Sequence, residues 1–237
     1  MYRPSSFSQL PEIVKNLLII NGLFFLATIS LESYGINFTK WFALHQFQSQ
    51  DFMPHQLITH MFMHGSPSHI VFNMFALWMF GKTLENVWGA KRFLIYYMIT
   101  GLGAAFIYIL FIQYQIYGIA NEFPDFLEAA KNGRYNTGNV NSLRLTQLVT
   151  LPMVGASGAV YGLLLAFGML FPNTLLYIYF AIPVKAKYLV MALGAIALFS
   201  GLRDNPADNV AHFAHLGGML FGFILLKYWQ KTNTQFY

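Results

Sequence analysis

One serine lies within a run of small residues, "VGASGAVYG" at 154–162, in a stretch that is otherwise apolar. The hydroxyl of Ser157 is a poor nucleophile at neutral pH unless a base removes its proton, and histidine is the most common base. His215, in "NVAHFAHLGGMLFG" at 209–222, brings an imidazole into a second apolar run. The two residue types predict nucleophilic attack on a carbonyl by a serine–histidine pair.

Attack on an amide also creates an oxyanion, which needs donors placed in advance. His69 and Asn73 are four residues apart in an apolar run, so they share one face of a helix. An imidazole N–H, an asparagine amide and the backbone N–H of Ser157 can all donate to the oxyanion. Gly155 leaves room beside them for the backbone of a substrate.

No carboxylate is well placed to form a triad. Asp204 and Asp208 precede the run that contains His215, and Asp208 is about two helical turns away from it. A dyad is therefore favoured.

Other histidines raise the question of a metal. His60 and His64 are four apart, and His69 or His212 could join them. However, the sequence contains no H-E-x-x-H motif and no cysteine. We therefore expect no bound metal and no cofactor.

The composition places these residues in a membrane. Hydrophobic residues make up 56% of the 237 residues and charged residues only 10%, whereas soluble domains have about 25% charged residues. Basic residues are scattered, so the net charge of +5 does not indicate nucleic-acid binding. We predict an all-α bundle of six membrane-spanning helices, each with roughly the length that a bilayer requires, at about 16–31, 68–84, 93–112, 155–171, 188–202 and 210–228.

Glycine pairs predict how two of these helices meet. Gly158 and Gly162 in the fourth span, and Gly218 and Gly222 in the sixth, each form a G-x-x-x-G pattern. Small residues at this spacing let helix backbones approach closely in lipid. The serine and the histidine would then meet near the ends of their helices.

The distribution of positive charge sets the expected orientation. Most of the 14 Lys and Arg residues lie on the side of the amino end, which is therefore expected to be cytoplasmic in a plasma (inner) membrane. The first span lacks the flanks of a cleaved signal peptide. Residues 1–237 are expected to form one membrane domain with a core at about 54–228. The polar stretch 114–154 would be a long extramembrane loop, with a short helix at 124–131.

The chain resembles the rhomboid family of intramembrane serine proteases in four segments: "HMFMHGSPSHIVFNMFAL" at 60–77, "LENVWGAKRFLIYY" at 84–97, "GASG" at 155–158 and "AHLGGMLFG" at 214–222. The resemblance implies a six-helix core with a water-filled site open to the outer side. It also implies hydrolysis of a peptide bond in or beside the transmembrane segment of single-span or multi-span membrane proteins. Ser157 would be the nucleophile, His215 the base, and His69 and Asn73 the oxyanion donors.

Glu85 and Arg92 flank the turn between the second and third spans, and we expect them to form a structural ion pair.

Two other functions are consistent with a membrane bundle. A catalytically inactive rhomboid-like protein would bind membrane proteins without cutting them, but such relatives usually lose the serine or the histidine. A histidine-lined transporter or metal channel would need acidic residues deep in its spans, and the expected spans contain none there.

Overall fold

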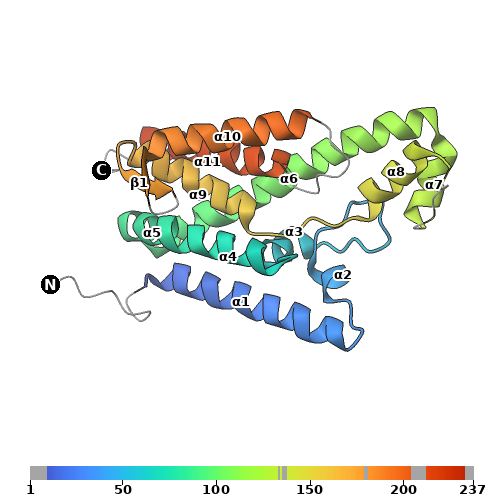
Figure 1. Cartoon of the computed structure of the whole chain (residues 1–237), viewed down its shortest axis with the longest axis horizontal. Coiled ribbons are helices and arrows are strands. Elements are labelled where there is room, and N and C mark those ends of the chain that lie inside the picture. Colours follow the sequence, from blue (N-terminus) through green and yellow to red (C-terminus); the bar gives the residue numbers. More distant parts are fainter. Residues whose placement is uncertain (1–9, 133, 135–137, 179–180, 204–211, 233–237) are drawn as a thin grey trace.

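The structure, a computed structural model, describes residues 10–132, 134, 138–178, 181–203 and 212–232. Most of these residues are helical (Figure 1). The elements in chain order are α1 (Glu12–Ser33), α2 (Phe38–Phe42), α3 (Gln56–Thr59), the 3₁₀ helix η2 (His60–Phe62), α4 (Pro67–Ala76), the π-helical turn η3 (Leu77–Gly81), α5 (Lys82–Trp88), α6 (Ala90–Glu122), α7 (Pro124–Lys131), α8 (Val140–Thr150), α9 (Ser157–Leu170), β1 (Leu175–Ile178), β2 (Ile182–Lys185), α10 (Ala186–Leu202) and α11 (His212–Thr232).

Helices occupy all six positions that were expected to span a membrane, with α4, η3 and α5 in succession at the second. In the described part of the chain, α1 and α6 are the two helices long and apolar enough to cross a membrane by length and composition. The helices α9 and α10 are apolar but shorter. The expectation of a helical fold is therefore confirmed. Of the six expected spans, two meet this criterion of length and composition in the described part of the chain.

The fold is not purely helical. The strands β1 and β2 form an antiparallel hairpin in which Leu175 pairs with Lys185. The helix α9 ends just before Pro172, which cannot continue a helix. The residues that follow are rich in Ile, Val and Tyr, which favour strands. The all-α expectation is wrong at this hairpin.

The long helix α6 is the centre of the packing. It has 33 residues, which corresponds to a length of about 50 Å. Both α9 and α11 pack against it. In Figure 1 α6 runs from the end that carries the hairpin to the end that carries α7 and α8. Because α6 is longer than a bilayer is thick, its last turns reach beyond the apolar region.

The stretch 114–154 is mainly helical in its described part rather than a loop. The helix α6 continues to Glu122, and α7 coincides with the short helix expected at 124–131. The helix α8 was not expected. Four buried apolar side chains give this unit a small core of its own: Ile116, Ala130, Leu145 and Val149. A few well-spaced apolar residues thus order a segment whose composition is polar.

The first helix is fixed by a carboxylate from α5. Glu85 is 4% exposed. Its two oxygens accept the backbone N–H groups of Ile13 and Val14 at 2.9 and 2.8 Å. The first N–H groups of a helix have no partner within the helix, and the positive end of the helix dipole favours an anion there. Glu85 therefore caps α1, a role that the expected ion pair with Arg92 did not include.

Replacing this cap should destabilise the protein. We expect Glu85→Gln to lower the free energy of unfolding by about 1.5–3 kcal/mol. The substitution removes a buried charged acceptor, and the NH2 group of the glutamine would face a backbone N–H donor that then has no acceptor. Thermal unfolding in detergent measures the change. Glu122→Gln, at an exposed position at the end of α6, is the matched control and should have little effect. Equal stability of the two variants would contradict the capping role.

Candidate active site

The residue two positions before the serine has a backbone conformation that favours glycine. Gly155 has a φ of +124°. A Cβ atom on it would lie 2.8 Å from Nε2 of His69. Its N–H donates to the carbonyl of His60 at 2.9 Å. The chain turns sharply at this point, and Ser157 becomes the first residue of α9.

The serine and histidine singled out from the sequence meet in the structure. The Oγ atom of Ser157 lies 2.9 Å from Nε2 of His215 on α11. His215 is 9% exposed and Ser157 is partly exposed. With Nε2 accepting from the hydroxyl, the ring proton resides on Nδ1. This tautomer can take the proton of the serine.

Close backbone contact between α9 and α11 makes this distance possible. A Cβ atom on Gly218 would overlap the carbonyl oxygen of Gly158. The helices therefore touch where neither glycine carries a side chain, directly after the serine on α9 and one turn after the histidine on α11. One glycine of each expected pair makes this contact.

Three of the four glycines also lie against α6, a contact that the glycine pattern did not predict: Gly158, Gly162 and Gly222. A Cβ atom on Gly158 would strike Ala104, and one on Gly162 would lie 2.6 Å from Thr100. A Cβ atom on Gly222 would overlap the hydroxyl of Tyr96. That hydroxyl donates to the carbonyl of Gly162 at 2.9 Å. The two helices are thus held together on the surface of a third.

An aromatic ring that the sequence analysis missed holds the imidazole. Tyr161 stacks on His215 with ring centroids 4.1 Å apart and planes 5° from parallel. Tyr161 is one helical turn after Ser157 on the same face of α9. That four-residue spacing is the feature of the sequence that could have revealed it.

The two residues expected to stabilise an oxyanion lie on α4. The ring of His69 packs against Gly155, next to the serine. The amide of Asn73 is buried and donates to the carbonyl of His69 at 2.9 Å. This bond fixes the amide along the face of α4 that carries His69. The N-cap of α4 is Ser66, whose hydroxyl accepts the N–H of His69 at 3.2 Å.

Hydrogen bonds from residues 44–60, which precede α4, hold the chain just before Ser157 in place. Leu44 and Met153 exchange two backbone hydrogen bonds, at 2.8 and 2.9 Å. Ring atom Nδ1 of His60 lies 2.9 Å from the carbonyl of Gln56. Together with the hydrogen bond from the N–H of Gly155 to the carbonyl of His60, these contacts fix the chain that leads into α9. The sequence analysis assigned no such role to this segment.

The histidines considered as metal ligands have other contacts. Burial lowers the pKa of both His60 and His64 to about 4, and His69 adds to the effect at His64. Both rings are therefore neutral at pH 7. The ring of His64 meets that of His69 edge to face, with centroids 5.0 Å apart. Across the described ranges, no group of three or more His, Cys, Asp or Glu residues could hold a metal ion.

The site is described as a pair rather than a triad. Asp204 and Asp208, the carboxylates considered for a third position, lie outside the described residues, as do the first two residues of the expected sixth span. Within the described ranges, Nδ1 of His215 has no hydrogen-bond partner.

Comparison with known proteins shows the family to which the chain belongs. The family model described as "Rhomboid domain" matches residues 51–231. The chain is 29% identical over 226 residues to RHOMBOID-like protein 12, mitochondrial, of Arabidopsis thaliana, covering 95% of this chain and 60% of that protein. It is 28% identical over 182 residues to Rhomboid protein 1, mitochondrial, of Saccharomyces cerevisiae, covering 73% and 42%. It is 25% identical over 173 residues to the human Presenilin-associated rhomboid-like protein, mitochondrial, covering 70% and 36%. The chain thus spans less than two thirds of the length of these relatives.

These names correct one expectation. The plasma-membrane location inferred from the charge distribution is wrong, because the relatives named above are mitochondrial proteins. The assignment of the two sides as cytoplasm and exterior falls with it. The distribution of Lys and Arg describes an asymmetry across a membrane, but it does not say which membrane.

The contact between α9 and α11 can be tested by adding one methyl group. We expect Gly218→Ala to lower the free energy of unfolding by about 1–3 kcal/mol or more, because the methyl group would force the two backbones apart. Thermal unfolding in detergent measures this. Gly22→Ala on α1 is the matched control, since its methyl group would meet nothing within 4 Å. That control should be neutral, or more stable by up to about 1 kcal/mol. Similar behaviour of the two variants would contradict the close contact.

Proposed function

Because the chain belongs to the rhomboid family, we propose that it is a serine endopeptidase that cuts membrane proteins in or beside their transmembrane segments. Ser157 is the nucleophile and His215 is the base. The observation that carries this proposal is the distance of 2.9 Å between the Oγ of one and the Nε2 of the other. Both residues also lie in the segments that resemble the family's motifs.

The first step is acylation. Oγ of Ser157 attacks the scissile carbonyl carbon while Nε2 of His215 takes the hydroxyl proton. The C–N bond then breaks, and the imidazolium returns the proton to the departing amine. Tyr161 keeps the ring in the plane that this transfer needs, because the two rings are stacked. Water subsequently attacks the acyl-enzyme with the same histidine as base.

The oxyanion is stabilised by donors from two helices. The N–H of Ser157 lies at the start of α9, where backbone donors have no partner within the helix. The imidazole of His69 is beside Gly155, next to the serine. The amide of Asn73 has a second N–H beyond the one that bonds to His69. These groups are held by the protein before the charge develops, which is what makes them effective.

A substrate backbone would approach at Gly155. This residue carries no side chain, and His69 fills the space that a Cβ atom would need. A small residue next to the cut, and a segment that leaves its helix easily, would suit this narrow approach. Both features are implied by the family resemblance.

The arrangement in the membrane is part of the proposal. Helices at six positions support a six-helix core, with α1 and α6 as the clearest spans. The names of the relatives support a mitochondrial membrane as the location. Fractionation of cells that express the tagged chain tests this location.

Removing either member of the pair should abolish activity. We expect Ser157→Ala and His215→Ala each to prevent cleavage of a single-span substrate in liposomes. A fluorophosphonate should label the wild type and not Ser157→Ala, because the reagent needs an activated serine. Gel analysis of cleavage and of labelling measures both effects.

Ser200→Ala and His55→Ala are the matched controls for this experiment, since neither residue contacts the pair. Both controls should cleave and label like the wild type. Labelling that persists in Ser157→Ala would overturn the assignment of the nucleophile. A wild type that binds substrates but neither cleaves nor labels would instead be an inactive relative.

The role of Asn73 can be separated from substrate binding. We expect Asn73→Ala to lower kcat about a hundred- to a thousandfold, the usual loss for one oxyanion donor. KM should change little, because the oxyanion exists only in the transition state. Steady-state kinetics with a fluorogenic membrane substrate gives both constants. A higher KM with an unchanged kcat would place Asn73 in substrate binding instead.

A further inference from the structure

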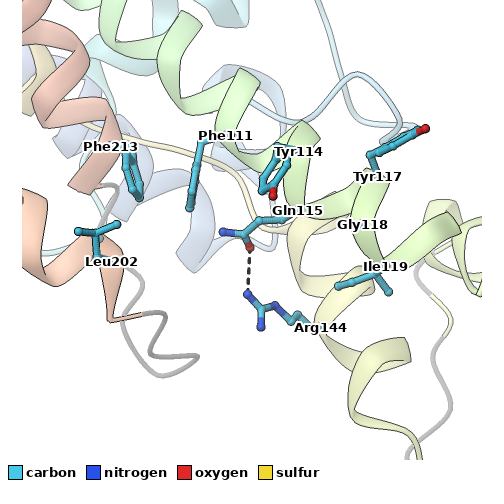
Figure 2. Close-up of a pocket in the computed structure, with 10 residues that line it drawn as sticks. Phe111, Tyr114, Gln115, Tyr117, Gly118, Ile119, Arg144, Leu202 and Phe213 are labelled. Atoms are coloured by element: carbon cyan, nitrogen blue, oxygen red, sulfur yellow. Dashed lines mark hydrogen bonds between the residues drawn. The ribbon is translucent and has the colours of Figure 1, made fainter. Parts of the chain in front are cut away.

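A cavity lies apart from the serine and histidine, between the end of α6 and the facing ends of α8, α10 and α11. It has a volume of about 460 Å³. Figure 2 shows Phe111 and Phe213 side by side at one end and Arg144 reaching toward Gln115 at the other. The cavity therefore has an apolar end and a cationic end.

The apolar end is aromatic and open. Phe111 and Phe213 stack with ring centroids 3.9 Å apart. Leu202, at the end of α10, also lines the cavity and is 65% exposed. Tyr114 and Tyr117 stand along α6 and are 77% and 65% exposed. Exposed apolar side chains at the end of an apolar helix suit hydrocarbon better than water.

The cationic end holds a guanidinium. The Nη2 atom of Arg144 donates to Oε1 of Gln115 at 3.2 Å, so the side chain is held over the cavity. A guanidinium offers a planar fork of N–H donors that matches the oxygens of a phosphate. Among the described residues that line the cavity, none is acidic.

The depth of the cavity matches the level of lipid headgroups. Lys91 and Arg92 stand at the first turn of α6 and mark one boundary of the apolar region. At 1.5 Å per residue, positions 111–119 lie about 30–42 Å further along the helix. The hydrocarbon core is about 30 Å thick, and the headgroups bring the total to about 40–45 Å. The aromatic end therefore lies where acyl chains begin and the arginine where phosphates lie. The exposed tyrosines agree with this level, because Tyr is enriched at membrane interfaces.

We propose that this cavity binds an anionic glycerophospholipid. The phosphate pairs with Arg144, and the upper part of one acyl chain lies against Phe111, Phe213 and Leu202. A lipid satisfies both ends of the cavity at the depth at which the cavity lies. An extended peptide is disfavoured because the helices that line the cavity offer no strand edge for its backbone.

The bound lipid would connect two parts of the protein. Arg144 and Gln115 belong to the unit formed by α7, α8 and the end of α6, whereas Leu202 and Phe213 belong to α10 and α11. Phe213 is two residues before His215. A lipid in this position would stabilise the unit against the helix that carries the histidine. This inference does not depend on the proposed protease activity.

The test is competitive binding of phosphatidylglycerol and phosphatidylcholine to the purified full chain in detergent, measured by native mass spectrometry. We expect the wild type to retain phosphatidylglycerol in preference to phosphatidylcholine. In Arg144→Gln the affinity for phosphatidylglycerol should fall by about tenfold or more, the size expected for a charge-assisted hydrogen bond. Arg134→Gln is the matched control. It removes the same charge from an exposed position in the same unit, outside the cavity, and should bind like the wild type.

A second variant tests the open space of the cavity without removing the charge. Gly118 lines the cavity, and a Cβ atom on it would meet nothing within 4 Å. Gly118→Leu should therefore place its side chain in the open space of the cavity, and it should reduce retention of both lipids. Gly118→Ala, which leaves most of the space open, should not.

Three results would overturn the proposal. One is retention of phosphatidylglycerol by Arg144→Gln at the level of Arg134→Gln. Another is unchanged binding of both lipids by Gly118→Leu. The third is displacement of phosphatidylglycerol by millimolar inorganic phosphate, which would show a site for a free anion. A preference for phosphatidylglycerol that depends on both Arg144 and the open space at Gly118 supports the lipid site.

Discussion

The contact on which the rest of the structure depends is between two backbones. Gly218 on α11 lies directly against the carbonyl of Gly158 on α9, with no room for a single methyl group. Lipid gives little hydrophobic drive for helix association, so close packing of this kind must supply it. A side chain at Gly218 would separate the two helices and, with them, the hydroxyl of Ser157, next to Gly158, and the imidazole of His215, one turn before Gly218. The hydrogen bond of 2.9 Å between Ser157 and His215 is a consequence of that contact.

Around this contact, buried polar groups are held mainly by backbone atoms of other segments. The hydroxyl of Tyr96 on α6 bonds to the carbonyl of Gly162, and the carbonyl of His60 receives the N–H of Gly155. Elsewhere in the bundle, the carboxylate of Glu85 accepts the first backbone N–H groups of α1. Each bond satisfies a group that would be costly to leave without a partner in an apolar surrounding. Each also joins elements that are distant in the chain, which makes the arrangement around the serine rigid.

The unit beyond α6 shows how a polar segment can serve a membrane protein. Its own core is small and is formed by Ile116, Ala130, Leu145 and Val149. The cavity beneath Arg144 joins this unit to the start of α11, two residues from the histidine. The lipid around the protein would thus act as a structural component at the border between the bundle and its extramembrane part. The mitochondrial names of the relatives make the composition of that membrane relevant to the chain.

The sequence by itself determined the helical class, the candidate serine and histidine, and the glycine spacing that brings their helices together. These features are local, because apolar runs, small residues and turn-forming glycines act within a few positions of the chain. Only the tertiary structure decided that Tyr161 stacks on the imidazole, that Glu85 caps a helix far away in the chain, and that 114–154 builds its own core. It also showed a hairpin in the connection between the expected fourth and fifth spans. Such features depend on which surfaces meet after the chain has folded, and neither composition nor spacing specifies a partner that lies on another element.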